Sequence, residues 1–485
     1  MRHPQLLVLA LTLATASLAI AAEKPIPQDP AKTAKRSRER LEFQRRTLQG
    51  AYDKIGKRDP RWDKPAREAL ELAAQMFSLQ IDPDVNVPDV NKPAKTAVNA
   101  GCDDPMVVYL YQRTLSGSDY PGLEETIRRA KSWSQGLADS KYPVFRRAIA
   151  VELAAEYLLS SKPLTDEIKK EAERGFDATL AMLPNSVAQD DRNEFWEDRW
   201  FGCFIDLIRG YRGIGVEPEA ALKRVDDALA NLPDLNPVRL QIQGEFWYRY
   251  SWEARTTAFA ANVPAGGFEK FGERMLKGRE ALEEAWRLRP ENARIADALI
   301  EIDKGIGGDR DTMELWFERA MKADGNDRSA CWSKLDWLDP KWHGAEEEML
   351  EFGRACRDTK NWHTGIILLV ADAHYRHSAR LGDGRRKYLG SPEVWSDIES
   401  VNTEYLKHFP DDDVVRSKYA ALCSMAGRFP EAHAQFEALG DRLVQWTESP
   451  YIPLNVLQRM RGEVAKAVAA KPKPSAAASP GPKLD

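Results

Sequence analysis

Apolar residues recur along most of the chain at the spacing of one face of an α-helix. Four stretches show this pattern clearly: residues 66–81, 123–137, 146–160 and 166–183. Proline and glycine fall between such stretches more often than within them, as short connections between helices require. Alternation typical of β-strands is scarce. The pattern therefore predicts one helix after another from Trp62 onward.

A large apolar residue followed three positions later by alanine recurs with a fixed period. The copies are Leu282 and Ala285, Phe317 and Ala320, and Phe352 and Ala355, 35 residues apart twice over. Residues three apart share a helix face, and about 34 residues is the period of a two-helix tetratricopeptide unit. We expect the large side chain to fill the groove of a neighbouring helix pair, while the alanine lets two backbones approach.

Looser copies of the same signature, A-x3-F-x2-A-x4-P, extend the repeat in both directions. Ala172, Phe176 and Thr179 fit it before Pro184, and Ala221, Val225 and Ala228 fit it before Pro233. Ala432 and Phe436 stand where a last unit would place them. The prolines are expected to stop their helices. We predict an all-α fold, a right-handed superhelical array of antiparallel helix pairs (a tetratricopeptide-like α-solenoid).

The chain divides into five predicted segments. These are a signal peptide (1–22), a basic N-terminal arm and leading helix (23–60), the helical repeat domain (61–446), a C-terminal helix (447–470) and a disordered tail rich in Pro, Ala and Lys (471–485). Arg2, the apolar stretch that follows it and the small residues around Ile20 are typical of a secretory signal. An uncleaved membrane anchor is the alternative, but the apolar stretch is short for a bilayer span of ~20 residues. We expect export, to a periplasm or beyond the cell.

The arm after the signal is strongly basic. Between Lys24 and Arg46 lie eight Lys and Arg residues against three acids, and the pattern turns helical from about Thr33. The arm could dock on an acidic surface or on anionic lipid. It could equally be a solvated helix that leads into the fold, which the pattern favours.

Overall composition adds little to this picture. The 485 residues carry a formal net charge of −5, with 43% hydrophobic and 30% charged residues, so nothing favours nucleic acid as a partner. The five cysteines are an odd count and form no C-x-x-C, so their pairing stays open. They are Cys102, Cys203, Cys331, Cys356 and Cys423.

Two stretches near the middle of the chain are dense in aromatic residues. Clustered Trp and Tyr could line a groove for a sugar or a peptide, because ring faces stack on apolar ligand faces. At helical spacing such residues are more often core, and both interpretations stay open. The candidate groove residues are Trp196, Trp200, Trp247, Tyr248 and Trp252.

No motif indicates catalysis or a cofactor. His363, His374 and His377 could share one helix face, but His363 would lie about 16 Å along the axis from His374 at 1.5 Å per residue, so the three cannot bind one metal ion. The remaining pair is interpreted as a surface feature. The glycines at 305–308 follow no strand and predict a turn. We expect no catalytic, cofactor or metal-ligating residue.

Residues 245–440 resemble a family of exported bacterial proteins defined only as a domain of unknown function with tetratricopeptide-like helices. The resemblance rests on the segments 246–255, 316–324, 338–344, 349–354 and 388–395, of which Trp342 with Gly344 is the most distinctive. It implies a helical-repeat fold and no established activity. The expected function is a non-catalytic protein-interaction scaffold in the cell envelope. The alternative is a glycan-binding or glycan-cleaving envelope protein that uses residues 194–259.

Overall fold

The computed structural model describes residues 30–78, 87–115, 119–256, 262–446 and 451–470. The predicted signal peptide and the predicted C-terminal tail lie outside these residues. Within the described ranges the regular structure is helical, apart from one isolated bridge between Trp446 and Ile452. The predicted all-α class is therefore confirmed.

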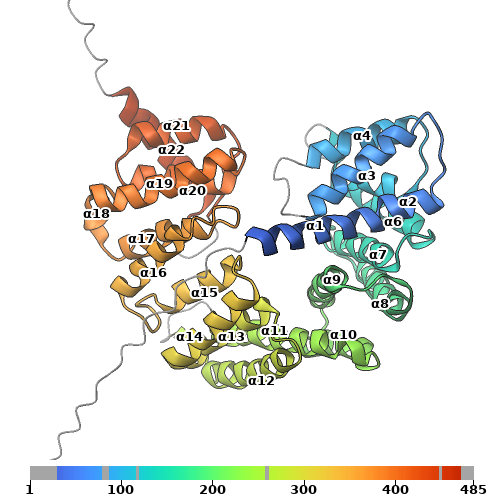
Figure 1. Ribbon diagram of the computed structural model, residues 1–485, viewed down its shortest axis with the longest axis horizontal. Coiled ribbons are helices and arrows are strands. Elements are labelled where there is room, and N and C mark those ends of the chain that lie inside the picture. Colours follow the sequence, from blue (N-terminus) through green and yellow to red (C-terminus); the bar gives the residue numbers. More distant parts are fainter. Residues whose placement is uncertain (1–29, 79–86, 116–118, 257–261, 447–450, 471–485) are drawn as a thin grey trace, which may run out of the picture.

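The helices follow one another along an arc, so that each packs mainly on its neighbours in sequence (Figure 1). The four stretches with helical spacing fall in α3, α6, α7 and α8. The first part of the arc consists of α1 (Pro30–Thr47), α2 (Gln49–Ile55), α3 (Asp63–Ser78), α4 (Val87–Asn99), α5 (Pro105–Arg113), α6 (Leu123–Ala138), α7 (Val144–Leu158), α8 (Asp166–Gln189), α9 (Glu194–Gly213), α10 (Pro218–Ala230) and α11 (Asn236–Arg255).

The second part of the arc continues in the same manner. It consists of α12 (Gly267–Leu288), α13 (Ala293–Ile306), α14 (Arg310–Ala323), α15 (Arg328–Trp337), α16 (Glu346–Asp358), α17 (Leu369–Ser378), α18 (Arg385–Leu389), α19 (Pro392–His408), α20 (Asp413–Met425), α21 (Phe429–Leu439) and α22 (Leu454–Ala469). Among the helices described, none combines the length and the hydropathy that crossing a bilayer requires.

The buried apolar side chains form successive clusters along the arc, each shared by a few consecutive helices. In the cluster around α11–α17, Leu282, Phe317 and Phe352 lie on α12, α14 and α16, the second helices of three successive pairs. The rings of Phe317 and Phe352 meet edge to face with centroids 5.5 Å apart. Neighbouring pairs are thus joined through the repeated position, as stacking of two-helix units requires.

One predicted helix end is wrong. Pro184 lies inside α8, which continues to Gln189. A proline in a helix interior costs about 3 kcal/mol, but the last turn is held by the packing of buried Leu183 and by Ser186. The Ser186 hydroxyl accepts hydrogen bonds from two buried indoles, at 3.1 and 2.9 Å. By contrast, α10 ends before Pro233, as expected.

Helix α1 departs from this nearest-neighbour arrangement. Its second half packs into the first part of the arc, where Phe43 stacks on Phe145 with centroids 5.5 Å apart. Its first half crosses the hollow of the arc toward the loop between α14 and α15 (Figure 1). The basic arm is therefore neither a purely solvated helix nor a free arm, because it contacts acidic side chains of its own chain.

Candidate functional site

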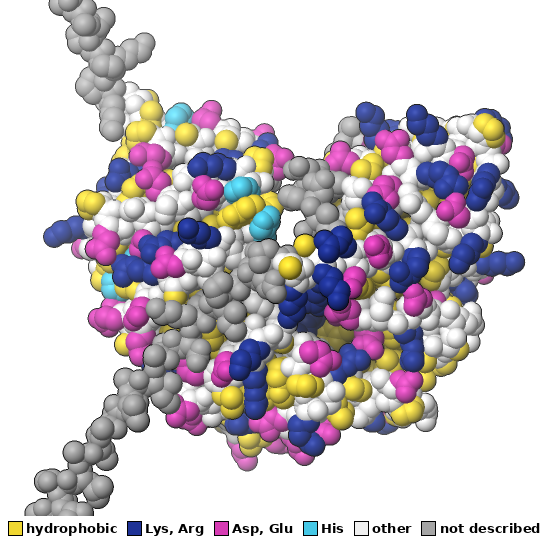
Figure 2. Space-filling model, in the orientation of Figure 1, with side chains coloured by type: hydrophobic (Ala, Val, Ile, Leu, Met, Phe, Trp, Pro, Cys, Tyr) yellow, Lys and Arg dark blue, Asp and Glu magenta, His cyan; other side chains and the backbone are white. Residues whose placement is uncertain are grey.

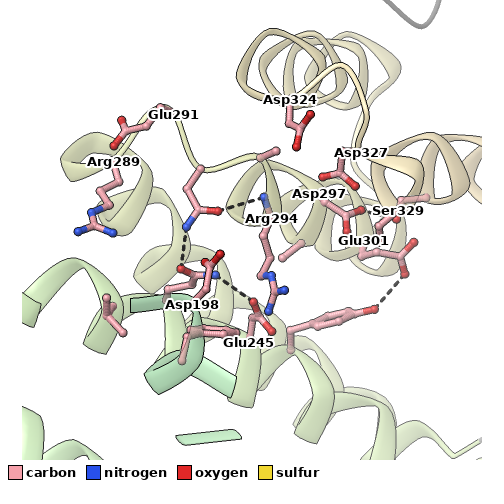
Figure 3. Close-up of a pocket in the computed structure, with 18 of the residues that line it drawn as sticks. Asp198, Glu245, Arg289, Glu291, Arg294, Asp297, Glu301, Asp324, Asp327 and Ser329 are labelled. Atoms are coloured by element: carbon pink, nitrogen blue, oxygen red, sulfur yellow. Dashed lines mark hydrogen bonds between the residues drawn. The ribbon is translucent and has the colours of Figure 1, made fainter. Parts of the chain in front are cut away.

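A cavity of about 700 Å³ lies on the concave side of the arc, beneath the first half of α1. Helices α9, α11, α13 and α15 form its walls, and Figure 3 shows side chains from several of them pointing into it. Ten carboxylate and six basic side chains line the cavity. The carboxylates are Glu194, Glu197, Asp198, Glu245, Glu291, Asp297, Glu301, Asp324, Asp327 and Asp336. The basic residues are Arg36, Arg40, Arg249, Arg289, Arg294 and Lys304. We call this cavity the acidic cleft.

Helical spacing explains why these side chains converge. Glu245 and Tyr248 follow Gln241 on α11 at steps of four and three residues, and Glu301 and Lys304 follow Asp297 on α13 in the same steps. Positions related in this way lie on one helix face. Each wall helix therefore presents one polar stripe to the cleft and turns its apolar stripe to the core.

Hydrogen bonds between the walls fix the floor of the cleft. Tyr248 of α11 donates to Glu301 of α13 at 2.9 Å. Before α13, Asn292 donates to the Gln241 oxygen at 3.0 Å, and Gln241 in turn donates to Glu245 at 3.2 Å. Gln241 and Glu245 are both buried. The polar floor is thus preorganised rather than a mobile surface.

A buried ion cluster closes the C-terminal end of the cleft. The ammonium of Lys304 lies 2.7 Å from Glu301 and 2.6 Å from Asp336, and Arg376 also donates to Asp336. Burial alone would lower the pKa of Lys304, but the two carboxylates outweigh it and raise this pKa. Burial would likewise raise the pKa of Asp336, yet the two cations hold it below the ordinary value. The cluster stays ionised at neutral pH.

Asp297 lies at the centre of the polar stripe of α13, and its pKa is raised, in contrast to that of Asp336. Burial and, next, the negative charge of Asp327 raise its pKa, although Ser333 donates to it at 2.6 Å. A carboxylate whose pKa is raised by burial and by a neighbouring carboxylate is a group whose charged form an incoming cation would stabilise. Arg294 also points into the cleft, toward Glu245 (Figure 3), and offsets part of the negative charge.

Polar contacts from α1 form the roof. Arg36 lies 3.0 Å from Asp324 and 3.2 Å from Glu194, and Arg40 lies 3.4 Å from Asp198. Lys and Arg side chains gather near the centre of the molecule, where α1 crosses the hollow (Figure 2). The roof therefore complements the charge of the walls.

The structure places most residues of the predicted repeat motif in the core. The side chains of Leu282, Ala285, Phe317, Ala320, Phe352 and Phe436 are buried, while Ala355 is half-buried on α16. None of them lines the acidic cleft.

The core interpretation of the aromatic stretches is confirmed at Trp196 and Trp200, and the alternative of a ligand groove is wrong there. Both indoles are buried in the core and donate to Ser186, so no ligand can reach them. Trp252 packs edge to face on Phe271, with centroids 4.9 Å apart. Tyr248 faces the acidic cleft, whereas Trp247 lines a second, outer cavity of about 780 Å³ between α11 and α12. The five aromatics do not form one surface.

The histidines also differ from the expected surface pair. His374 is fully buried, with one ring nitrogen 2.7 Å from the Tyr388 hydroxyl and the other 3.1 Å from Asp397. His377 lies 3.0 Å from Glu346. In the described part of the chain, His, Cys, Asp and Glu side chains form no group that could hold a metal ion. The glycines at 305–308 lie at the end of α13, where a turn was expected.

Sequence reasoning missed the carboxylates of the cleft. Acidic residues are common on exposed helix faces, so no single one stood out. The usable signal was the repetition of Asp or Glu at steps of three and four on consecutive helices, beside the apolar stripe. That signal becomes specific only when the helix pairs are known to curve toward a common centre.

The fold and the cleft together define an α-solenoid with a charged concave site. No family model and no curated protein matches the chain. The resemblance to the exported family therefore remains a prediction, based on the segments given above.

Solved structures with some similarity are also helical. Yeast Tom70 is 14% identical over 92% of this chain and 91% of that chain, with a TM-score of 0.30. A circular tandem repeat protein with novel repeat topology is 12% identical over 90% of this chain and 98% of that chain, with a TM-score of 0.22. The structure of Naa15/Naa10 bound to HypK-THB is 11% identical over 90% of this chain and 73% of that chain, with a TM-score of 0.23. Scores this low do not establish a shared fold, so the fold class rests on the helix packing described above.

Proposed function

We propose that the protein is a non-catalytic scaffold that binds a basic segment of a partner protein in the acidic cleft. The excess of carboxylates over cations on the concave side supports this function. Concave faces of helical-repeat proteins offer extended binding surfaces. Lys and Arg side chains of a partner would find carboxylates already oriented by Gln241, Tyr248 and Ser333.

Binding of defined peptides tests this function. Fluorescein-labelled helical peptides of equal length, one rich in Lys and Arg, one neutral and one rich in Glu, are titrated with the full chain, and anisotropy is recorded. We expect saturable binding of the basic peptide alone, weakened by salt. Equal binding of all three peptides would contradict the proposal.

Charge-neutralising variants then locate the site. Asp297→Asn with Glu291→Gln removes two carboxyl groups from the cleft, and we expect affinity for the basic peptide to fall about tenfold, or about 1.4 kcal/mol. Glu219→Gln with Glu269→Gln removes two exposed negative charges from α10 and α12, outside the cleft, and is the matched control. Equal losses of peptide affinity in the two double variants would mean that binding depends on net charge alone and not on the cleft.

The cell envelope is the proposed location, because residues 1–22 have the pattern of a secretory signal. Mass spectrometry of the protein recovered from its host tests this. A mature chain that begins at Glu23 is expected, and an intact Met1 would contradict export by cleavage.

A glycan ligand is a second proposal, supported by the outer cavity alone. There, Trp247 lies beside the exposed side chain of Leu276, with the Lys277 ammonium 4.5 Å from its ring centre. Titration with envelope polysaccharides while Trp fluorescence is recorded distinguishes the two functions. A saturable change that Trp247→Leu abolishes would favour the glycan.

A further inference from the structure

Residues 31–40, the first half of α1, differ from the second half in how they are held. Apart from buried Ser37, their side chains are exposed or half-buried, and none of them is a buried apolar residue. The second half buries Leu41 and Phe43. One half of the helix is thus anchored by the hydrophobic effect, and the other by polar contacts alone.

Those polar contacts connect the start of α9, on one side of the hollow, to the end of α14 on the other side. Lys32 donates to the Ala323 carbonyl at 2.9 Å, at the C-terminus of α14, where the helix dipole favours a cation. Arg36 joins Asp324, after α14, to Glu194 at the start of α9. Thr33 accepts a hydrogen bond from Asn326 at 2.7 Å.

The contact at Asn326 reaches one unit further along the arc. Asn361, in the loop after α16, donates to the Asn326 oxygen at 2.9 Å and is itself buried. Residues 31–40 therefore contact the connection between α14 and α15 directly, and that connection is in turn held by the loop after α16. Their partners are separated from them by up to 293 residues in sequence.

Contacts of this kind are readily exchanged. Exposed or half-exposed ion pairs contribute little individually and weaken as salt screens them. In addition, residues 31–40 carry the same charge as the segment that the cleft is proposed to bind. A basic segment of a partner would compete for the same carboxylates.

We propose that residues 31–40 are a releasable clasp that holds the arc closed and shields the acidic cleft until a basic partner segment displaces them. The identity of the displacing partner rests on the proposed function, whereas the clasp itself does not. Leu41 and Phe43 keep the second half of α1 in place, so release swings only the first half away. The N-terminal and C-terminal parts of the arc can then move apart.

A distance measurement on the full chain tests the clasp directly. Spin labels are placed on Ser132→Cys in α6 and Asp411→Cys before α20, both at exposed positions, while the five native cysteines are buried. Double electron–electron resonance gives the distance distribution. Lys32→Gln with Arg36→Gln removes the clasp contacts, and Lys35→Gln with Arg38→Gln removes the same charge from exposed positions of the same segment.

We expect the Lys32/Arg36 variant to lengthen and broaden the distribution by several ångströms, as 0.5 M NaCl does in the unmodified protein. The Lys35/Arg38 variant should match the unmodified protein in low salt. An unchanged distribution in the Lys32/Arg36 variant and in high salt would overturn the clasp, whatever peptides bind.

A synthetic peptide of residues 30–40 then tests the competition. We expect it to bind the Lys32/Arg36 variant at least tenfold more tightly than the unmodified protein or the control variant. Equal affinity for all three would overturn the shielding role. If the distance between the spin labels is longer in the Lys32/Arg36 variant but the peptide does not bind, the clasp is supported and the proposed basic partner is overturned.

Discussion

Gly244 of α11 and Gly278 of α12 face each other where the two helices cross. A side-chain carbon on either glycine would lie 3.1 Å from the carbonyl oxygen of the other. At Gly244 it would also lie 2.4 Å from Cγ of Leu282, the first large residue of the repeated motif. The close crossing of these helices therefore depends on the absence of two side chains.

Replacing Gly244 should destabilise the protein. Alanine gains up to about 1 kcal/mol in helix propensity, but the contact at the branched Cγ of Leu282 adds an overpacking cost of about 1–3 kcal/mol. We expect Gly244→Ala to lower the unfolding free energy by about 1–2 kcal/mol, measured by denaturant titration. Gly272→Ala on α12 meets no atom within 4 Å and should stabilise instead. Stabilisation by both would contradict the close crossing.

The repeated aromatic position should be sensitive to truncation. Phe317 is fully buried against Phe352, and the Lys334 ammonium lies 4.3 and 5.0 Å from the two ring centres. We expect Phe317→Ala or Phe352→Ala to cost about 3–5 kcal/mol.

Filling the small position of the motif gives a complementary test. Ala320→Leu should overpack the same interface by about 1–3 kcal/mol. Thermal unfolding monitored by circular dichroism measures all three variants. A melting temperature unchanged in every one would show that the motif does not join the helix pairs.

Stability should fall between about pH 4.5 and about pH 8 because of Glu152 on α7. Burial and, next, the charges of Asp206 and Glu156 raise its pKa to about 8 from an ordinary value of 4.5. The folded chain then holds a proton that the unfolded chain has released, so this contribution is full below pH 4.5 and is lost as pH rises through about 8. The slope is at most about 1.4 kcal/mol per pH unit.

Glu152→Gln should remove this dependence. Urea titrations at pH 5, 7 and 9 should show the variant close to the unmodified protein at pH 5 and more stable at pH 9. Glu253→Gln, which removes a carboxylate paired with Arg212 at 2.8 Å, controls for the lost charge. Parallel pH profiles for the unmodified protein and Glu152→Gln would contradict the assignment.

The cysteines should resist thiol reagents in the folded protein. All five are free and buried, and burial raises the pKa of Cys102 to about 11 and raises those of Cys203 and Cys423 as well. The reactive thiolate is therefore scarce as well as shielded. We expect Ellman's reagent to label no thiol in native buffer and all five in 6 M guanidinium. Rapid labelling of one native thiol would show local opening there.

The sequence predicted the helical class because apolar spacing and breakers are local signals. It also located α12, α14 and α16, whose large residues recur at a fixed period. It failed at Pro184, where tertiary contacts of Leu183 and Ser186 outweigh the loss of one backbone hydrogen bond. For Trp196 and Trp200 the sequence left a ligand groove open beside the core interpretation, because their shared partner Ser186 cannot be identified without the fold.

The acidic cleft could not be predicted for a different reason. Glu245, Asp297 and Asp336 lie on α11, α13 and α15, in three successive helix pairs, and only the curvature of the arc brings them together. Helix spacing gives each stripe, but curvature depends on many small packing angles between units. The docking of Arg36 on Asp324 is more distant still in sequence, and charge alone did not distinguish an internal surface from an external one.

The contact between Arg36 and Asp324 spans 288 residues, in a fold whose helices pack mainly on their neighbours in sequence. During translation, α1 leaves the ribosome well before its carboxylate partner has been made. Each helix pair can fold as it leaves the ribosome, but the ion pair between Arg36 and Asp324 cannot form until two thirds of the chain has been synthesised. Its formation therefore comes late on the folding pathway, and a polypeptide halted before Asp324 would keep its positive segment available to chaperones or other ligands.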